Sequence, residues 1–178
     1  MNTKLRIMLP AVVVGFVGLS ALFAHEMPMA KPGSKEFEQL KQLAGSWKGV
    51  KTPAEKGQKS ETVSIQFKVT SMGSAVEETL GMGTPNEMVD MYTDENGKLT
   101  MTHYCAMGNQ PHLLLKQSNP KQITLEMGPT PGIDSSKDTH MHALSLEFPD
   151  ANHLIEKWTS YEGGKPAETA VFTLTRSQ

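Results

Sequence analysis

The chain has 178 residues, of which 38% are hydrophobic, 20% charged and 6% aromatic, and its formal net charge is −2. This length is typical of a single domain, and the slight excess of acidic residues argues against a nucleic-acid binder that relies on positive charge. The single cysteine excludes a disulfide framework within the chain.

Residues 1–24 have the pattern of a secretory signal peptide. Lys4 and Arg6 precede a long apolar run, and Ala24 is a small residue at a plausible cleavage point. An uncleaved membrane anchor is the alternative, because about 18 apolar residues are enough to span a bilayer. We expect residues 25–33 to form a flexible arm and residues 34–178 the mature domain. The predicted location is periplasmic or secreted, with no integral membrane span after cleavage.

One short helix is predicted at the start of the mature domain. Ser34 is a good N-cap, and Phe37, Leu40 and Leu43 follow it at intervals of three residues. Gly45 is suited to end the helix. The helix is therefore expected to have one narrow apolar face.

After this helix, apolar and polar residues alternate, which is the periodicity of β-strands. The pair Asn96-Gly97 between two such segments is a strong signal for a hairpin. About ten strands are predicted, near residues 46–51, 62–70, 75–81, 87–93, 98–105, 112–118, 122–128, 140–148, 153–161 and 167–176. Short connections imply an antiparallel meander, which avoids exposed edges by closing on itself. The expected fold class is all-β, a single antiparallel up-and-down β-barrel.

The helix, the motif Gly45-Ser46-Trp47 and the meander together resemble the lipocalin-like (calycin) superfamily. In that superfamily a Gly-x-Trp motif opens the first strand, and an arginine near the end of the barrel packs on the tryptophan. The resemblance implies that Trp47 and Arg176 close the barrel, since Arg176 is the only arginine after the signal. A guanidinium group stacks well on an indole.

Residues 102–111 are similar to a segment of uncharacterised secreted bacterial members of the superfamily. More distantly, the chain resembles nitrobindin-like and fatty-acid-binding-protein-like barrels. Nitrobindins ligate haem through a histidine late in the chain, whereas no histidine follows His153 here.

A polar cluster is predicted inside the barrel, because two strands carry histidines on their apolar faces. His103 and Cys105 end one strand, and His140 and His142 begin another. Strand direction places all four at the end opposite Trp47, which we term the mouth. The candidate ligand-binding residues are those of the mouth, the loop after it and the apolar wall: His103, Cys105, Asn109, Gln110, His140, His142, Met101, Phe67 and Leu144.

Three interpretations of this cluster are open. It could be a hydrogen-bonded polar patch at a solvated rim, or it could contact a small ligand directly. Alternatively, His103, Cys105, His140 and His142 could bind zinc or copper. No hydrolase motif accompanies Cys105, so this residue is expected to be a small buried side chain, and no catalytic residue is assigned.

These observations predict a non-catalytic binding protein for a small, largely apolar ligand. A barrel of ten strands is wider than one of eight, whose side chains nearly fill it, so space should remain for a ligand. The expected cavity walls are Val63, Phe67, Met101, Leu125, Leu144 and Phe172. The alternatives are a metal- or haem-associated barrel that uses the mouth cluster, and a calycin-type enzyme of unassigned chemistry. We expect no nucleic-acid partner, and a monomer or weak dimer.

Overall fold

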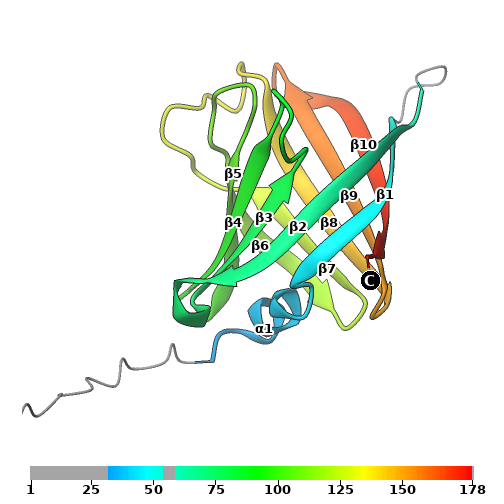
Figure 1. Ribbon diagram of the computed structural model, residues 1–178. Helices are drawn as coiled ribbons and strands as arrows, with labels where there is room; N and C mark the ends of the chain where they lie inside the picture. Colours follow the sequence, from blue (N-terminus) through cyan, green and yellow to red (C-terminus); the bar gives the residue numbers. More distant parts are fainter. Residues whose placement is uncertain (1–31, 54–58, 178) are drawn as a thin grey trace, which may run out of the picture.

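The structure, a computed structural model, describes residues 32–53 and 59–177. The predicted signal peptide and most of the predicted arm lie outside the described residues. Ten antiparallel strands close into a barrel, and one short helix lies at its lower end (Figure 1). The fold class predicted from the sequence is therefore confirmed. No helix in the described part of the chain is long and apolar enough to cross a membrane.

Each strand pairs with its neighbours in the chain, and the first pairs with the last. The strands are β1 (Gly45–Pro53), β2 (Glu61–Thr70), β3 (Ala75–Leu80), β4 (Met88–Glu95), β5 (Lys98–Tyr104), β6 (His112–Asn119), β7 (Gln122–Met127), β8 (His140–Asp150), β9 (His153–Glu162) and β10 (Lys165–Arg176). A 3-10 turn, η1 (Ser71–Gly73), links β2 to β3. The alternation of apolar residues thus located every strand to within a few residues.

Helix α1 (Lys35–Lys41) begins and packs as its sequence predicts. The Ser34 side chain accepts a hydrogen bond from the backbone N–H of Phe37, as an N-cap does. Phe37 and Leu40 are buried against the barrel. The Ser34 backbone N–H also donates to Asp94 on β4, at 2.6 Å, which ties the start of the helix to the barrel.

The end of the barrel next to α1, which we term the base, is closed by Trp47 and Arg176. These residues pair between β1 and β10, and the guanidinium carbon lies 4.4 Å from the centroid of the indole ring. The guanidinium group donates to the carbonyls of Gln42 and Ala44, at 2.7 and 2.8 Å, and the indole N–H donates to that of Leu43, at 2.8 Å. One arginine therefore joins the last strand to the first and also satisfies carbonyl groups that follow the helix.

Apolar side chains fill the base half of the barrel. Phe67 packs edge-on against Trp47, with ring centroids 6.5 Å apart. Four of the residues expected to line a cavity belong instead to this packed core: Phe67, Met101, Leu125 and Leu144. The prediction of an open interior is therefore wrong for this half of the barrel, and the remaining space lies toward the mouth.

Candidate functional site

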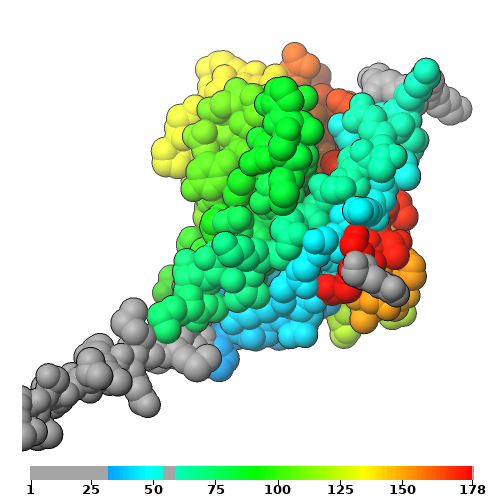
Figure 2. Space-filling model, viewed as in Figure 1, coloured from blue at the N-terminus to red at the C-terminus, as the bar shows by residue number. Residues whose placement is uncertain are grey.

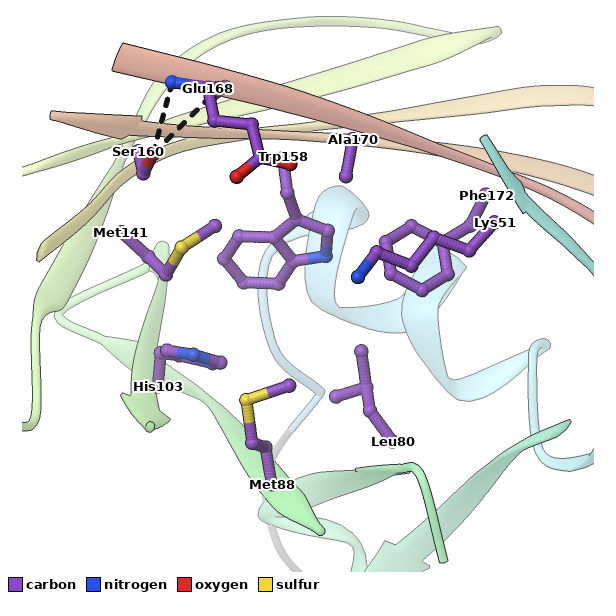
Figure 3. Close-up of a pocket in the computed structure, with 10 residues that line it drawn as sticks. All are labelled: Lys51, Leu80, Met88, His103, Met141, Trp158, Ser160, Glu168, Ala170 and Phe172. Atoms are coloured by element: carbon purple, nitrogen blue, oxygen red, sulfur yellow. Dashed lines mark hydrogen bonds between the residues drawn. The ribbon is translucent and has the colours of Figure 1, made fainter. Parts of the chain in front are cut away.

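A cavity occupies the mouth half of the barrel (Figure 3). Its volume is about 150 Å³. Its lining residues come from seven strands: Lys51, Leu80, Met88, His103, Met141, Trp158, Ser160, Glu168, Ala170 and Phe172. Most of them are apolar, and of the six walls expected from the sequence only Phe172 is among them. A cavity of this size accommodates a molecule comparable to benzene.

A groove on the barrel side leads toward this cavity. Ile65 pairs with Leu80, the last residue of β3, so residues 61–64 of β2 extend beyond the end of that strand. The groove between this part of β2 and the β3–β4 connection shares Lys51 and Met88 with the cavity. Figure 2 shows the corresponding notch between teal β2 and the green segment beside it. The cavity is therefore approached from the side as well as from the mouth.

His103 and Asp90 form a buried pair beside the cavity. They are register partners on β5 and β4, and both side chains point inward. The Nδ1 atom of His103 lies 2.5 Å from Oδ1 of Asp90, and the two side chains are 2% and 0% exposed. The second ring nitrogen, Nε2, is buried and has no hydrogen-bond partner within the described residues. This pair holds one orientation of the imidazole and leaves its other nitrogen available.

Two glutamates and a tyrosine extend this polar group across the interior. Glu78 lies opposite Asp90 in the β3–β4 register and accepts a hydrogen bond from the Tyr92 hydroxyl, at 2.7 Å. Glu156 projects inward from β9, and neither of its carboxyl oxygens has a hydrogen-bond partner in the part of the chain described. All of these side chains are fully buried. Three carboxyl groups thus share one enclosed space, which we term the acidic cluster (Glu78, Asp90 and Glu156).

Burial decides the protonation of the acidic cluster. It raises the pKa of Glu78 well above the ordinary value, and the charges of Glu156 and Asp90 raise it further. Burial, with the charge of Asp90, also raises the pKa of Glu156 to about 8. Burial therefore favours the neutral, protonated form of both glutamates, which avoids placing several uncompensated charges in a medium of low polarity.

The His103–Asp90 pair behaves differently. Burial on its own would lower the pKa of His103, but the hydrogen bond to Asp90 and the interaction with Cys105 outweigh it and raise the pKa to about 9. Burial raises the pKa of Asp90, and the bond to His103 opposes that rise. The imidazole is thus a cation at neutral pH, paired with a carboxylate.

Cys105 lies at the end of β5, two residues beyond His103 and half-buried. A turn fixes its backbone: its N–H donates to the carbonyl of Asn109, and its carbonyl accepts from Gly108. Burial raises the pKa of the thiol, but interactions with His103 and with the backbone N–H of Met107 lower it overall. The structure therefore adds an acid, Asp90, to the histidine and thiol that the sequence had already placed in one cluster.

His140 and His142 do not face the interior, so their predicted orientation is wrong. A β-bulge between Met141 and Ala143 shifts the β8–β9 register, and it is Met141 that lines the cavity. The ring of His142 stacks on that of Tyr161, with centroids 3.7 Å apart, and faces the β7–β8 connection. Counting inward and outward side chains back along β8 from Leu144 gives the wrong direction for these histidines. The reason is that the bulge adds one residue and reverses the side-chain direction.

The histidine pair on β8 has a fixed hydrogen-bond pattern. Nδ1 of His140 lies 2.8 Å from the carbonyl of Asp138, and its Nε2 lies 3.0 Å from Nδ1 of His142. The carbonyl can only accept, so His140 donates from Nδ1 and His142 donates to its Nε2 when both rings are neutral. Through these contacts, the two histidines stabilise the conformation of the β7–β8 connection.

The other predicted site residues lie outside the cavity. Asn109 donates to the carbonyl of Thr139, at 2.8 Å, and Gln110 to that of Gly108, at 3.1 Å, so both stabilise the mouth loops. Within residues 32–53 and 59–177, no three histidine, cysteine or acidic side chains are grouped so that they could hold a metal ion. The four-residue metal site considered from the sequence is therefore not assembled, because His140 and His142 lie on the side of the sheet opposite His103.

Sequence reasoning missed most polar residues around the cavity. Glu78, Asp90 and Glu156 each occupy a strand position whose neighbours two residues away are apolar and buried. An ionisable residue on the apolar face of a strand is the signal that could have revealed them. Lys51 on β1 lacks this signal, since its neighbours two residues away are Gly49 and Pro53, yet its amine points into the cavity (Figure 3).

Two solved structures share this architecture. One is a protein of unknown function from the DUF3598 family of Nostoc punctiforme, with a TM-score of 0.52 and 12% identity over 85% of this chain. The match covers 51% of that protein, so this chain spans about half its length. The other is Rv2717c from M. tuberculosis, with a TM-score of 0.52 and 14% identity over 83% of this chain and 100% of that one.

The search of family models and the search of curated proteins found no match. At identities this low, the two structures establish the fold alone. The chain has a closed antiparallel barrel of ten strands.

Proposed function

We propose that the barrel binds a small, largely apolar molecule in its mouth cavity. The observation that carries this proposal is an apolar cavity of about 150 Å³ beside a buried ring nitrogen, Nε2 of His103, that has no protein partner in the described residues. Ligand pockets commonly combine apolar walls with a few convergent polar groups. The small volume favours a ligand of about the size of a substituted benzene ring over a long-chain lipid.

The polar groups of the cavity favour a ligand with one hydrogen-bond acceptor. His103 and Trp158 lie ring to ring, with centroids 4.9 Å apart, and each has a buried N–H without a partner in the chain as described. The Lys51 amine adds a positive charge on the opposite wall (Figure 3). An acceptor such as a carbonyl or carboxylate oxygen would satisfy donors that otherwise carry a desolvation cost.

Titration with toluene, benzyl alcohol and benzoate, followed by Trp158 fluorescence and by calorimetry, tests this proposal. Benzoate should bind most tightly, because only it combines an apolar ring with a charged acceptor. Equal affinity for toluene and benzoate would contradict the role of the polar groups. No binding of any of the three, together with no adduct in native mass spectra of protein purified from its source, would overturn the proposal.

A filled cavity supplies the matched control. Ala170 lines the cavity and Ala167, on the same strand, is exposed. Ala170→Phe should abolish binding, whereas Ala167→Phe should leave it unchanged. Thermal unfolding of both variants separates loss of the cavity from loss of the fold.

We further propose that the protein acts outside the cytoplasm as a lipocalin-like member of the calycin superfamily. The basic start and apolar run of residues 1–24 support export, and the Gly45-Ser46-Trp47 motif with Arg176 supports the superfamily. The intact mass of protein from a periplasmic extract tests the location. A chain beginning at His25 is the expected result, and a full-length chain confined to the cytoplasm would contradict it.

A further inference from the structure

The end of β5 carries the only cysteine of the chain next to a histidine that is already oriented by an acid. His103 projects inward, and Cys105, two residues further along, lies on the same side of the chain. The turn that follows binds the backbone of Cys105 at both its N–H and its carbonyl, so the backbone that carries the thiol has a fixed position. Gly108 permits this turn, since its φ of 84° is one that other residues rarely adopt.

His103 can serve the thiol because Asp90 occupies only one of its two ring nitrogens. Nδ1 bonds to Asp90, whereas Nε2 is buried and has no hydrogen-bond partner in residues 32–53 and 59–177. A nucleophile, a base and an acid that orients the base are the components of activated thiol sites. The ring of His103 also lines the cavity, so a molecule bound there would lie close to this group.

We propose that Cys105 and His103 form a nucleophilic thiol site at the mouth, with Asp90 as the positioning residue, and that the site takes a small acyl group from an ester or thioester. The apolar cavity walls would receive the acyl chain, whose length is limited by the volume of about 150 Å³. Burial raises the pKa of the Cys105 thiol, but the interaction with His103 lowers it overall, which favours the thiolate form that a nucleophile requires.

The reaction consumes only the acyl compound and water. The thiolate sulfur attacks the carbonyl carbon, an S–C bond forms, and the bond from that carbon to the leaving group breaks. The imidazolium gives its proton to the leaving alcohol or thiol. Water then attacks the carbonyl carbon of the acyl group on Cys105 while His103 takes a proton from the water, and the S–C bond breaks to release the acid and restore the thiolate.

The pH dependence of alkylation is the first test, because one cysteine makes the intact mass a site-specific readout. The full chain is treated with iodoacetamide between pH 5 and 10. Wild-type protein should react with a rate that stays nearly level down to pH 6. A thiol with an ordinary pKa of about 8.5 would slow about tenfold per pH unit below that value, and such a profile would overturn the proposal.

Variants separate activation from folding. His103→Gln should lower the alkylation rate at pH 6 at least about tenfold, because the thiol regains an ordinary pKa. Asp90→Asn should lower it less, since the thiol and the imidazole both remain. His142→Gln is the matched control, a histidine near the mouth that faces away from the cavity, and it should react like the wild type. An unchanged profile in a folded His103→Gln protein would contradict the pairing.

The profile contains contributions from every ionisable group that shares the interior with His103. These are Asp90, Glu78 and Glu156 of the acidic cluster, Tyr92 beside them, Lys51 on β1 and Glu168 on β10. Glu156→Gln removes the neighbour whose pKa lies closest to the range measured. A profile that keeps its shape in this variant assigns the titration to Cys105 and His103, whereas a shift to that of an ordinary thiol would contradict the assignment.

Acyl transfer is tested with p-nitrophenyl acetate and p-nitrophenyl butyrate. One nitrophenolate should be released per chain in a burst, with the acyl group found on Cys105 by mass spectrometry and no burst in Cys105→Ser. A reactive thiol without a burst would overturn the acyl-transfer step.

The cavity-filling variant distinguishes this proposal from the proposed binding function. Ala170→Phe should slow the butyrate burst more than the acetate burst and leave iodoacetamide alkylation unchanged. If the cavity binds none of the aromatic probes but both bursts occur, the thiol proposal stands and the binding function fails. Equal bursts from both esters in Ala170→Phe would instead contradict the assignment of the acyl chain to the cavity.

Discussion

The base half and the mouth half of the barrel use the same ten strands but differ in what fills them. At the base, apolar side chains pack without a cavity around Trp47, and Arg176 closes the end. At the mouth, the interior holds a cavity and buried polar atoms that lack partners among the described residues. Close packing and satisfied polar groups are the usual sources of stability. The comparison therefore indicates that the base maintains the fold. The mouth half contributes less to stability, because its interior holds this cavity and these polar atoms.

The largest effect is expected from removing the central side chain of the base. Trp47→Ala should lower the free energy of unfolding by about 3–5 kcal/mol, because a closed, fully packed site cannot collapse around the missing ring. Trp158→Ala at the mouth should cost less, since Trp158 already borders a cavity. Denaturant titration of the two variants measures both values, and an equal loss would contradict the distinction between the halves.

A pH-dependent effect is expected from the mouth half. The pKa of Glu156 is about 8 in the folded protein, against an ordinary value of 4.5, so the folded state keeps a proton that the unfolded chain releases. The free energy of unfolding should therefore fall as the pH rises from about 4.5 to 8, by up to about 1.4 kcal/mol per pH unit. Glu156→Gln should reduce this slope, making the variant more stable than wild type at pH 8 and similar near pH 4.

The matched control for that variant is Glu162→Gln, an exposed glutamate on the same strand. It should leave the slope unchanged. The His103–Asp90 pair acts in the same direction: its stabilisation is complete below the ordinary histidine pKa of 6.5 and is lost as the pH rises through about 9. A slope that persists undiminished in Glu156→Gln would assign the whole effect to this pair.

A smaller effect is expected from Arg176→Lys at the base. The charge remains, but the planar stack on Trp47 and the hydrogen bonds to the carbonyls of Gln42 and Ala44 are lost. We expect a loss of about 1–2 kcal/mol in the free energy of unfolding. Lys157→Arg, on an exposed position of β9, is the control for a general effect of arginine content. A loss below the error of the measurement would show that charge alone is sufficient.

The smallest effect is expected from His142→Ala. The stack on Tyr161 should be worth about 0.5–1.5 kcal/mol, and its removal should loosen the β7–β8 connection. Binding of benzoate in the cavity should not change, because the side chain faces away from it. A loss of benzoate binding with the fold intact would contradict this orientation and would indicate that His142 lies at the rim of the cavity.

The sequence was sufficient for the strands and for the base. Apolar and polar residues alternate in β2, β5 and β9 because each strand has one buried and one exposed face. Such a pattern identifies a strand even when its ends are misplaced by a residue or two. The pairing of Trp47 with Arg176 follows from the number of strands, since closure of a barrel brings the first strand against the last. These features depend on periodicity, which the sequence carries locally.

The mouth half was less predictable because its features depend on departures from periodicity. The bulge at His142 reverses the side-chain direction, and nothing in the alternation of β8 announces it. The meeting of Glu156 on β9 with Glu78 on β3 depends on how side chains cross the interior, which strand order alone does not give. The orientation of His103 was predictable, but its partner Asp90 emerges only from the β4–β5 register.

The contact of Arg176 with the carbonyl of Leu43 joins residues 133 positions apart, and this separation has a kinetic meaning. At a synthesis rate of about 5–20 residues per second, the first strand waits roughly 7–27 s for the last one to be made. During that interval no closed barrel can form, because a non-local pairing must wait for its partner. A chain that stays open until translation is nearly finished can still be threaded through a narrow pore, which suits the export proposed above.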